Sequence, residues 1–182
     1  MAVVAALLVG GAAGCSSTGD SAKPAPAPEK TASPKAIPSK SAEEKATEQI
    51  LAAYAGMQTV QYEAYRTGKL DNARLQKYAR DKAASGVVVT LAWYKERGLK
   101  VVGRPRITPE VTTVDLRGNP KTAVLSDCLD SSPSDTVYKT TGKSAVNKGS
   151  KEPDRRPVTA KAVVVGERWL ISEYTIDRTR TC

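Results

Sequence analysis

The spacing of apolar residues changes at Gly98, and this change constrains the fold more than any other feature of the sequence. Between residues 41 and 97, apolar side chains recur every three or four positions, which is typical of amphipathic helices. After Gly98 they occur in short runs that turn residues separate, as strands require. Helices first and hairpin-connected strands afterwards predict an α+β fold, with N-terminal helices packed on an antiparallel sheet.

The first expected helix starts at Ser41 and ends at Gly68. Ser41 and Glu44 have the spacing of a capping box, and a glycine commonly ends a helix. One stripe of this helix is expected to face the core. Its members are Ile50, Leu51, Tyr54, Met57, Gln58, Gln61 and Tyr65.

Two shorter helices are expected next. Asp71 can cap the second helix, which would carry Leu75 and Tyr78. Residues 80–97 form the third, stopped by Gly98. The β-branched run Val87–Val89 leaves a strand as the alternative for this last segment.

Five strands are expected after Gly98. They cover Leu99–Val102, Ile107–Leu116, Thr122–Leu129, Val158–Val165 and Arg168–Ile176. Residues 117–120 and 166–167 have the composition of hairpin turns. Between residues 130 and 157 a long polar loop is expected, with Val137 and Tyr138 as a short edge strand.

The first 14 residues carry no charge and, after Met1, consist of Ala, Val, Leu and Gly. This segment is too short for a membrane-spanning helix and suits the apolar core of a secretory signal. It ends at Cys15 after Ala12, Ala13 and Gly14, and this arrangement resembles the signal of bacterial lipoproteins. The resemblance implies that residues 1–14 are removed and that Cys15 receives a lipid, which anchors an extracytoplasmic protein to the outer face of the cell membrane.

Two departures from the lipoprotein pattern leave alternatives open. Ala12 replaces the usual Leu, and no Lys or Arg precedes the apolar run. An ordinary cleaved signal, or a buried apolar segment with an incidental cysteine, would also fit.

Residues 15–42 are expected to form a tether that begins with the lipidated Cys15. The segment is rich in Pro, Ala, Ser and Lys and has almost no large apolar residue. Such a composition does not form a core, and its Pro-Ala alternation favours a semi-extended polyproline II spacer. Residues 43–182 remain as a single domain.

The other two cysteines, Cys128 and Cys182, lie in this domain. A pair of cysteines outside the cytoplasm is expected to oxidise, which predicts a disulfide that holds the C-terminus. Two unpaired buried thiols are the alternative.

The order of elements in residues 43–182 resembles the NTF2-like (cystatin-like α+β) domain, and more narrowly the domain of actinobacterial secreted lipoproteins of unknown function. The residues that carry the resemblance are Trp93, Asp127, Cys128, Asp130 and Trp169. It implies a curved sheet that forms a cone with the helices. Members of this family use the cone for catalysis or ligand binding, or fill it with side chains, so the fold does not choose a function.

The chain contains no histidine, which excludes Ser-His-Asp and Cys-His catalysis and histidine-based zinc sites within it. Glycine-rich phosphate loops, the dinucleotide-binding motif and the Ser-x-x-Lys motif are also absent from the sequence. We therefore expect no enzyme, no cofactor, no metal and no catalytic residue.

Carboxylates on the expected strands are the remaining candidates for acid-base chemistry with a tyrosine. They are Asp115, Asp127, Asp130 and Glu173. A solvated or structural role is expected for each, because polar residues of a half-exposed sheet normally face water. Asp127, Asp130 and Asp135 lack the spacing of a calcium loop.

Seven aromatic residues are expected mainly in the core, with an amphipathic pocket for a small apolar ligand as the alternative. They are Tyr54, Tyr62, Tyr65, Trp93, Tyr94, Trp169 and Tyr174.

The net charge of +9 predicts a basic face. Its expected members are Lys95, Arg97, Lys100, Arg104 and Arg106. For an exported, anchored domain this face indicates anionic envelope components and no nucleic acid. Solubility alone is the alternative explanation of the charge. The sequence thus predicts an envelope protein that binds a partner. The alternatives are a binder of a small apolar ligand and, third, an enzyme that uses Asp and Tyr.

Overall fold

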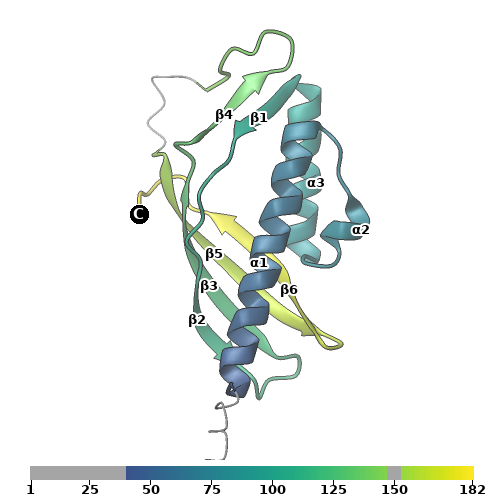
Figure 1. Ribbon diagram of the computed structural model, residues 1–182, viewed down its shortest axis with the longest axis vertical. Coiled ribbons are helices and arrows are strands. Elements are labelled where there is room, and N and C mark those ends of the chain that lie inside the picture. The colour runs from purple at the N-terminus through teal and green to yellow at the C-terminus, as the bar shows by residue number, and fades with distance from the viewer. Residues whose placement is uncertain (1–39, 147–152) are drawn as a thin grey trace, which may run out of the picture. The chain divides into compact units, whose positions relative to one another are not determined.

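The computed structural model describes residues 40–146 and 153–182, in which three helices precede six strands (Figure 1). The helices are α1 (Ala42–Thr67), α2 (Asn72–Leu75) and α3 (Asp81–Glu96). The strands are β1 (Leu99–Gly103), β2 (Glu110–Asp115), β3 (Thr122–Asp130), β4 (Ser134–Tyr138), β5 (Arg155–Val165) and β6 (Arg168–Ile176). Helices packed on antiparallel sheets confirm the α+β class. The expected signal peptide, the lipidation site and the tether up to residue 39 lie outside the described residues.

Helix α1 begins and ends where the sequence predicts. The Ser41 hydroxyl accepts a hydrogen bond from the Glu44 backbone N–H at 3.1 Å, and the Glu44 carboxylate accepts one from the Ser41 N–H at 2.7 Å. These bonds satisfy backbone donors that the helix itself leaves free. Gly68 ends the helix with φ +75°, a left-handed conformation that glycine adopts without strain.

The second helix is shorter than expected. Asp71 caps it by accepting a hydrogen bond from the Arg74 N–H, but α2 ends at Leu75. The prediction that it carries Tyr78 is wrong. The backbone there pairs with β6 instead: the Ile171 N–H donates to the Tyr78 carbonyl oxygen at 2.8 Å.

Residues 81–96 are helical, as the sequence predicts, and the β-branched run Val87–Val89 lies inside α3. Helix α3 packs along β6 and also contacts β1 and α1. These tertiary contacts outweigh the modest helix propensity of three successive valines.

The strands form two antiparallel sheets rather than one. Four strands pair in the order β2-β3-β5-β6, while β1 pairs only with β4. The expected edge strand at Val137 is part of β4, and β2 is shorter than the expected run 107–116. At the end of β1, a Cβ on Gly103 would lie 2.1 Å from the carbonyl oxygen of Pro133, so the close approach of these two backbones requires glycine.

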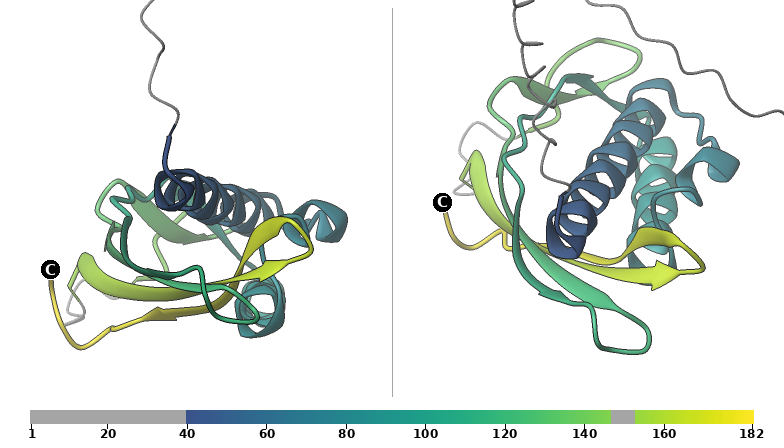
Figure 2. Two further views of the ribbon diagram at one scale, coloured as in Figure 1. Left: turned by 90° about the horizontal axis from the view of Figure 1, so that it is seen from below. Right: turned by 60° about the horizontal axis from the view of Figure 1, so that its bottom comes forward.

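Helix α1 lies across one face of the four-stranded sheet, and α3 lies beside the β6 edge (Figure 2). The side chains between helices and sheet form one apolar cluster. Its largest fully buried members are Tyr54, Ile50, Met57, Leu75, Leu125, Ile171, Val60 and Val87. In the described part of the chain, these residues come from all three helices and from β3 and β6.

A disulfide joins Cys128 of β3 to Cys182 at the C-terminus, across a sequence separation of 54 residues. It connects the last residue to the middle of the sheet. A terminal segment that would otherwise fray is held in place.

Candidate functional site

A buried polar cluster lies between α1 and the sheet. Asp127 is 6% exposed and Tyr54 is fully buried. The Tyr54 hydroxyl donates a hydrogen bond to Asp127 Oδ2 at 2.7 Å, and the Thr108 backbone N–H donates one to Oδ1 at 2.6 Å. Both carboxylate oxygens are engaged, which a buried carboxylate requires.

Tyr174 and Gln58 complete this cluster. The Tyr54 and Tyr174 ring centroids are 6.1 Å apart. Burial raises the pKa of Tyr174 to about 12, and Gln58 opposes part of the rise. Burial also raises the pKa of Tyr54, with Tyr174 and Asp127 adding to the rise. Within the described residues, the Tyr174 hydroxyl and Gln58 Nε2 are buried without a well-aligned hydrogen bond.

The cluster joins α1, β3, β6 and the segment before β2. Two neutral phenols and an enclosed carboxylate hold these elements together, and apolar side chains of the core surround them. Its geometry is therefore that of a structural network. Of the two expected roles, solvated or structural, Asp127 has the structural one, because it alternates in phase with buried Ala123 and Leu125 along β3.

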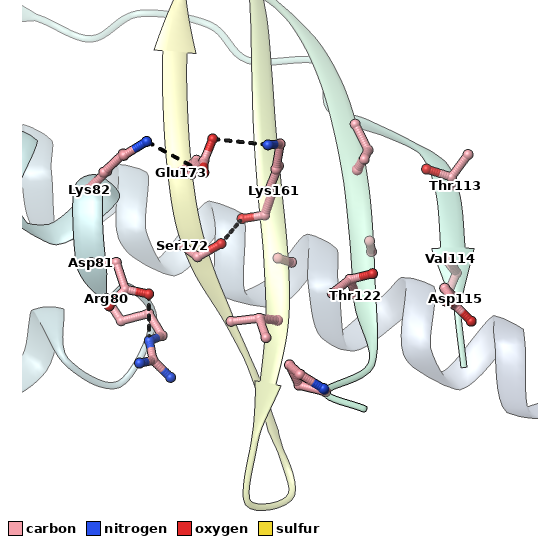
Figure 3. Close-up of a pocket in the computed structure, with 15 residues that line it drawn as sticks. Arg80, Asp81, Lys82, Thr113, Val114, Asp115, Thr122, Lys161, Ser172 and Glu173 are labelled. Atoms are coloured by element: carbon pink, nitrogen blue, oxygen red, sulfur yellow. Dashed lines mark hydrogen bonds and ion pairs between the residues drawn. The ribbon is translucent and has the colours of Figure 1, made fainter. Parts of the chain in front are cut away.

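The other three candidate carboxylates lie outside this cluster, and two of them, Asp115 and Glu173, line one groove on the other face of the sheet. Asp115 accepts hydrogen bonds from the N–H groups of the turn after β2, and these bonds lower its pKa. Asp130 forms an ion pair with Arg106 at 3.5 Å, and its hydrogen bonds with Ser132 lower its pKa. Glu173 lies on the opposite face of the sheet from α1 (Figure 3).

A shallow groove of about 590 Å³ crosses that opposite face, and the start of α3 forms one wall (Figure 3). Glu173 lies in it between two cations, 3.2 Å from Lys161 Nζ and 3.8 Å from Lys82 Nζ. Arg80 pairs with Asp81 at 2.8 Å. The polar groups of the groove are thus engaged by neighbouring groups: Glu173 by two lysines, Asp115 by turn N–H groups, and the Ser172 hydroxyl by the Lys161 carbonyl oxygen at 3.2 Å.

Within residues 40–146 and 153–182, no three side chains of the metal-binding types come together. None of the helices in these residues is long and apolar enough to cross a membrane.

The expected basic face is divided. Lys95, Arg97 and Lys100 lie around the end of α3 and the start of β1. Arg104 instead packs on α1, where it donates a hydrogen bond to the Thr59 hydroxyl at 3.1 Å and lies 5.8 Å from the Tyr62 ring. Arg106 pairs with Asp130, so the five cations do not form one surface.

The aromatic residues are divided between the core and the surface. Trp169 and Tyr54 are in the core, as expected. Trp93 is 44% exposed, so its expected core position is wrong. Its ring contacts Tyr94 at a centroid distance of 5.4 Å, and the Arg97 guanidinium lies 4.5 Å from its centroid.

Trp93 belongs to an exposed apolar surface on α3 that was not predicted from the sequence. We call it the outer face of α3. Val89 is 67% exposed, and Val88 and Trp93 are about half exposed. No charged residue occurs between positions 83 and 94, on any side of the helix. A helix that is uncharged all round is normally covered on all sides. The uncharged run 83–94 was therefore the sequence signal for a further surface that packs against α3.

No family model and no curated protein sequence matches the chain. Among solved structures, one match is the crystal structure of the intermembrane space region of the chloroplast protein ARC6. The two share 14% identity over 76% of this chain and 98% of that chain, with a TM-score of 0.43. A likeness at this level supports no statement about function.

Proposed function

We propose that this protein is a lipid-anchored, extracytoplasmic interaction domain of the cell envelope. Cys15 carries the anchor, residues 15–42 act as the tether, and the domain docks another protein chain through the outer face of α3. The observation that carries the docking proposal is the exposure of Val88, Val89 and Trp93 on a helix segment without charges. Exposed apolar side chains that gather on one surface are typical of interaction sites.

We further propose that the domain is a filled form of the NTF2-like cone. The order of a long helix, two shorter helices and antiparallel strands supports this, as does the apolar cluster between α1 and the sheet. Because a filled cone has no interior space for a ligand, the functional site is expected on the surface of the domain. The buried polar cluster of Tyr54, Gln58, Asp127 and Tyr174 then stabilises the interior.

The anchor is tested by cell fractionation. In the native host, the full chain is expected to appear in the membrane fraction and to incorporate a radioactive fatty acid. Cys15→Ser is expected to lose the label and to appear in the soluble extracytoplasmic fraction. A Cys15→Ser chain that stays in the membrane fraction without a label would contradict the lipid anchor.

The docking surface is tested by site-specific photocrosslinking in the same cells. A benzoylphenylalanine at position 89 is expected to give one adduct of defined mass, and Trp93→Lys is expected to abolish it. The same probe at Thr159, which is exposed on β5, serves as the matched control and is expected to give none. Equal adducts from positions 89 and 159, or none from either, would refute docking through α3.

A further inference from the structure

A row of exposed residues along α3 passes through Val89 of the outer face and has the spacing of a helix-pairing seam. Lys82, Ser85, Val89, Ala92 and Glu96 follow one another at intervals of three, four, three and four residues. This spacing places them on one side of the helix and matches the a and d positions of a heptad. All five are exposed, whereas the buried side of α3 carries Ala83, Val87 and Leu91.

The charges at the two ends of this seam complement each other about Val89. Lys82 lies seven residues before Val89 and Glu96 seven residues after it. Asp81 lies eight residues before Val89 and the exposed Lys95 six residues after it, both on the same side of the seam. If two copies of α3 cross antiparallel at Val89, each Lys82 meets the other copy's Glu96, and each Asp81 lies on the same side of the contact as the other copy's Lys95.

The side chains between the charges also complement each other. Trp93 lies four residues after Val89, and Ser85 lies four residues before it. The indole of one copy would therefore lie over Ser85 and Gly86 of the other. Gly86 is exposed, and a Cβ at this position would meet nothing within 4 Å, so no other part of the described chain covers this surface.

We propose that the outer face of α3 binds the same face of a second copy of this chain, antiparallel and centred on Val89. The inference rests on the proposed docking function and names its partner. Such a contact is isologous: it uses the same residues on both copies and closes after two.

The charges favour a second copy over other occupants. Lys82, Asp81, Lys95 and Glu96 are all exposed. The ion pairs that they form among the described residues lie at the surface: Lys82 with Glu173, Asp81 with Arg80, and Glu96 with Arg97. Such pairs contribute little and are easily exchanged. An anionic membrane would attract Lys82 and Lys95 but repel Asp81 and Glu96, whereas a second antiparallel copy brings each of the four beside an opposite charge.

A charge-swap experiment tests both the partner and the orientation. Sedimentation equilibrium is measured on the full chain with Cys15→Ser, which removes the lipid and the thiol at that position. Lys82→Glu and Glu96→Lys are each expected to weaken the dimer about tenfold, because each reverses two exposed pairs per dimer. The double variant restores both pairs and is expected to return within about threefold of the parent dissociation constant.

Lys121→Glu is the matched control, since it makes the same charge change at an exposed position outside α3. It is expected to leave the dimer unchanged. Thermal unfolding of each variant shows whether the domain itself is intact; no large change is expected, because Lys82 and Glu96 are solvent-exposed.

Three results would overturn the inference: a monomer at millimolar concentration, a dimer insensitive to both single swaps, or a double variant as weak as the singles. The photocrosslink at position 89 separates this failure from failure of the proposed function. An adduct with twice the mass of the chain supports the second copy. An adduct with a different protein refutes the second copy as the partner but supports docking through α3. A crosslink within one chain refutes both the second copy and docking through α3.

Discussion

Replacing Tyr54 by Phe tests whether the buried cluster stabilises the domain. The change removes only the hydroxyl that donates to Asp127 Oδ2 at 2.7 Å. Because Asp127 is 6% exposed, water cannot easily replace the lost donor. An unsatisfied buried acceptor costs about 1–3 kcal/mol, and more when it is charged. We therefore expect the free energy of unfolding to fall by about 2–3 kcal/mol, which corresponds to roughly 6–10 °C in Tm for a domain of this size.

The assay is urea unfolding followed by far-ultraviolet circular dichroism. The midpoint is expected to fall while the slope m stays constant, since the surface exposed on unfolding does not change. Tyr62→Phe is the matched control. Its hydroxyl is also buried but has no hydrogen-bond partner among the described residues, so its removal is expected to cost less than about 0.5 kcal/mol.

A double-mutant cycle with Asp127→Ala isolates the pair. The coupling free energy between Tyr54 and Asp127 is expected to be about 1 kcal/mol or more, because the two side chains share one buried hydrogen bond. Equal stabilities of Tyr54→Phe and Tyr62→Phe, or a coupling near zero, would refute the assigned role of the cluster.

Four further changes are expected to alter stability. Replacing both Cys128 and Cys182 by Ala is expected to cost on the order of 4 kcal/mol, because the disulfide closes a loop of 54 residues, and thiol labelling of the unfolded, unreduced parent should find neither cysteine reactive. Ser41→Ala removes the cap of α1 and should cost about 1 kcal/mol in urea unfolding, whereas Ser41→Asp should restore most of it. Gly103→Ala, at φ +69°, forces a Cβ against backbone and is expected to lower Tm by several degrees; an unchanged Tm would contradict the close approach. The pKa of Tyr174 is about 12 in the folded chain and about 10 when unfolded, so its contribution is complete below pH 10 and is lost as pH rises from 10 to 12. Urea midpoints should fall over that range, and less steeply in Tyr174→Phe.

The local rules of helix and strand formation were readable from the sequence. Ser41 and Gly68 mark the limits of α1, because caps and left-handed glycines act within a few residues. The strand β6 has the predicted bounds. The division into two sheets was not predicted, because it depends on how β1 meets the turn before β4, a contact between segments about 30 residues apart.

The candidate surfaces were harder to predict, for a physical reason. The alternation of Ala123, Leu125 and Asp127 was visible and places the carboxylate on the core face, but only the fold shows that Tyr54 lies opposite it. Trp93 was expected in the core because large aromatic residues usually are. Which side of an uncharged helix faces the core depends on its tertiary neighbours, so the exposed side of α3 became visible only in the structure.

Thiol labelling of intact cells with a membrane-impermeant maleimide tests both the extracytoplasmic location and docking through α3. Single cysteines are placed at Val89, on the outer face of α3, and at Thr159, which is exposed on the sheet. For an extracytoplasmic domain docked through α3, position 159 is expected to react quickly and position 89 to be protected, with Trp93→Lys exposing it again. Equal rapid labelling of both positions would contradict docking, and labelling of neither until the cells are lysed would contradict the location.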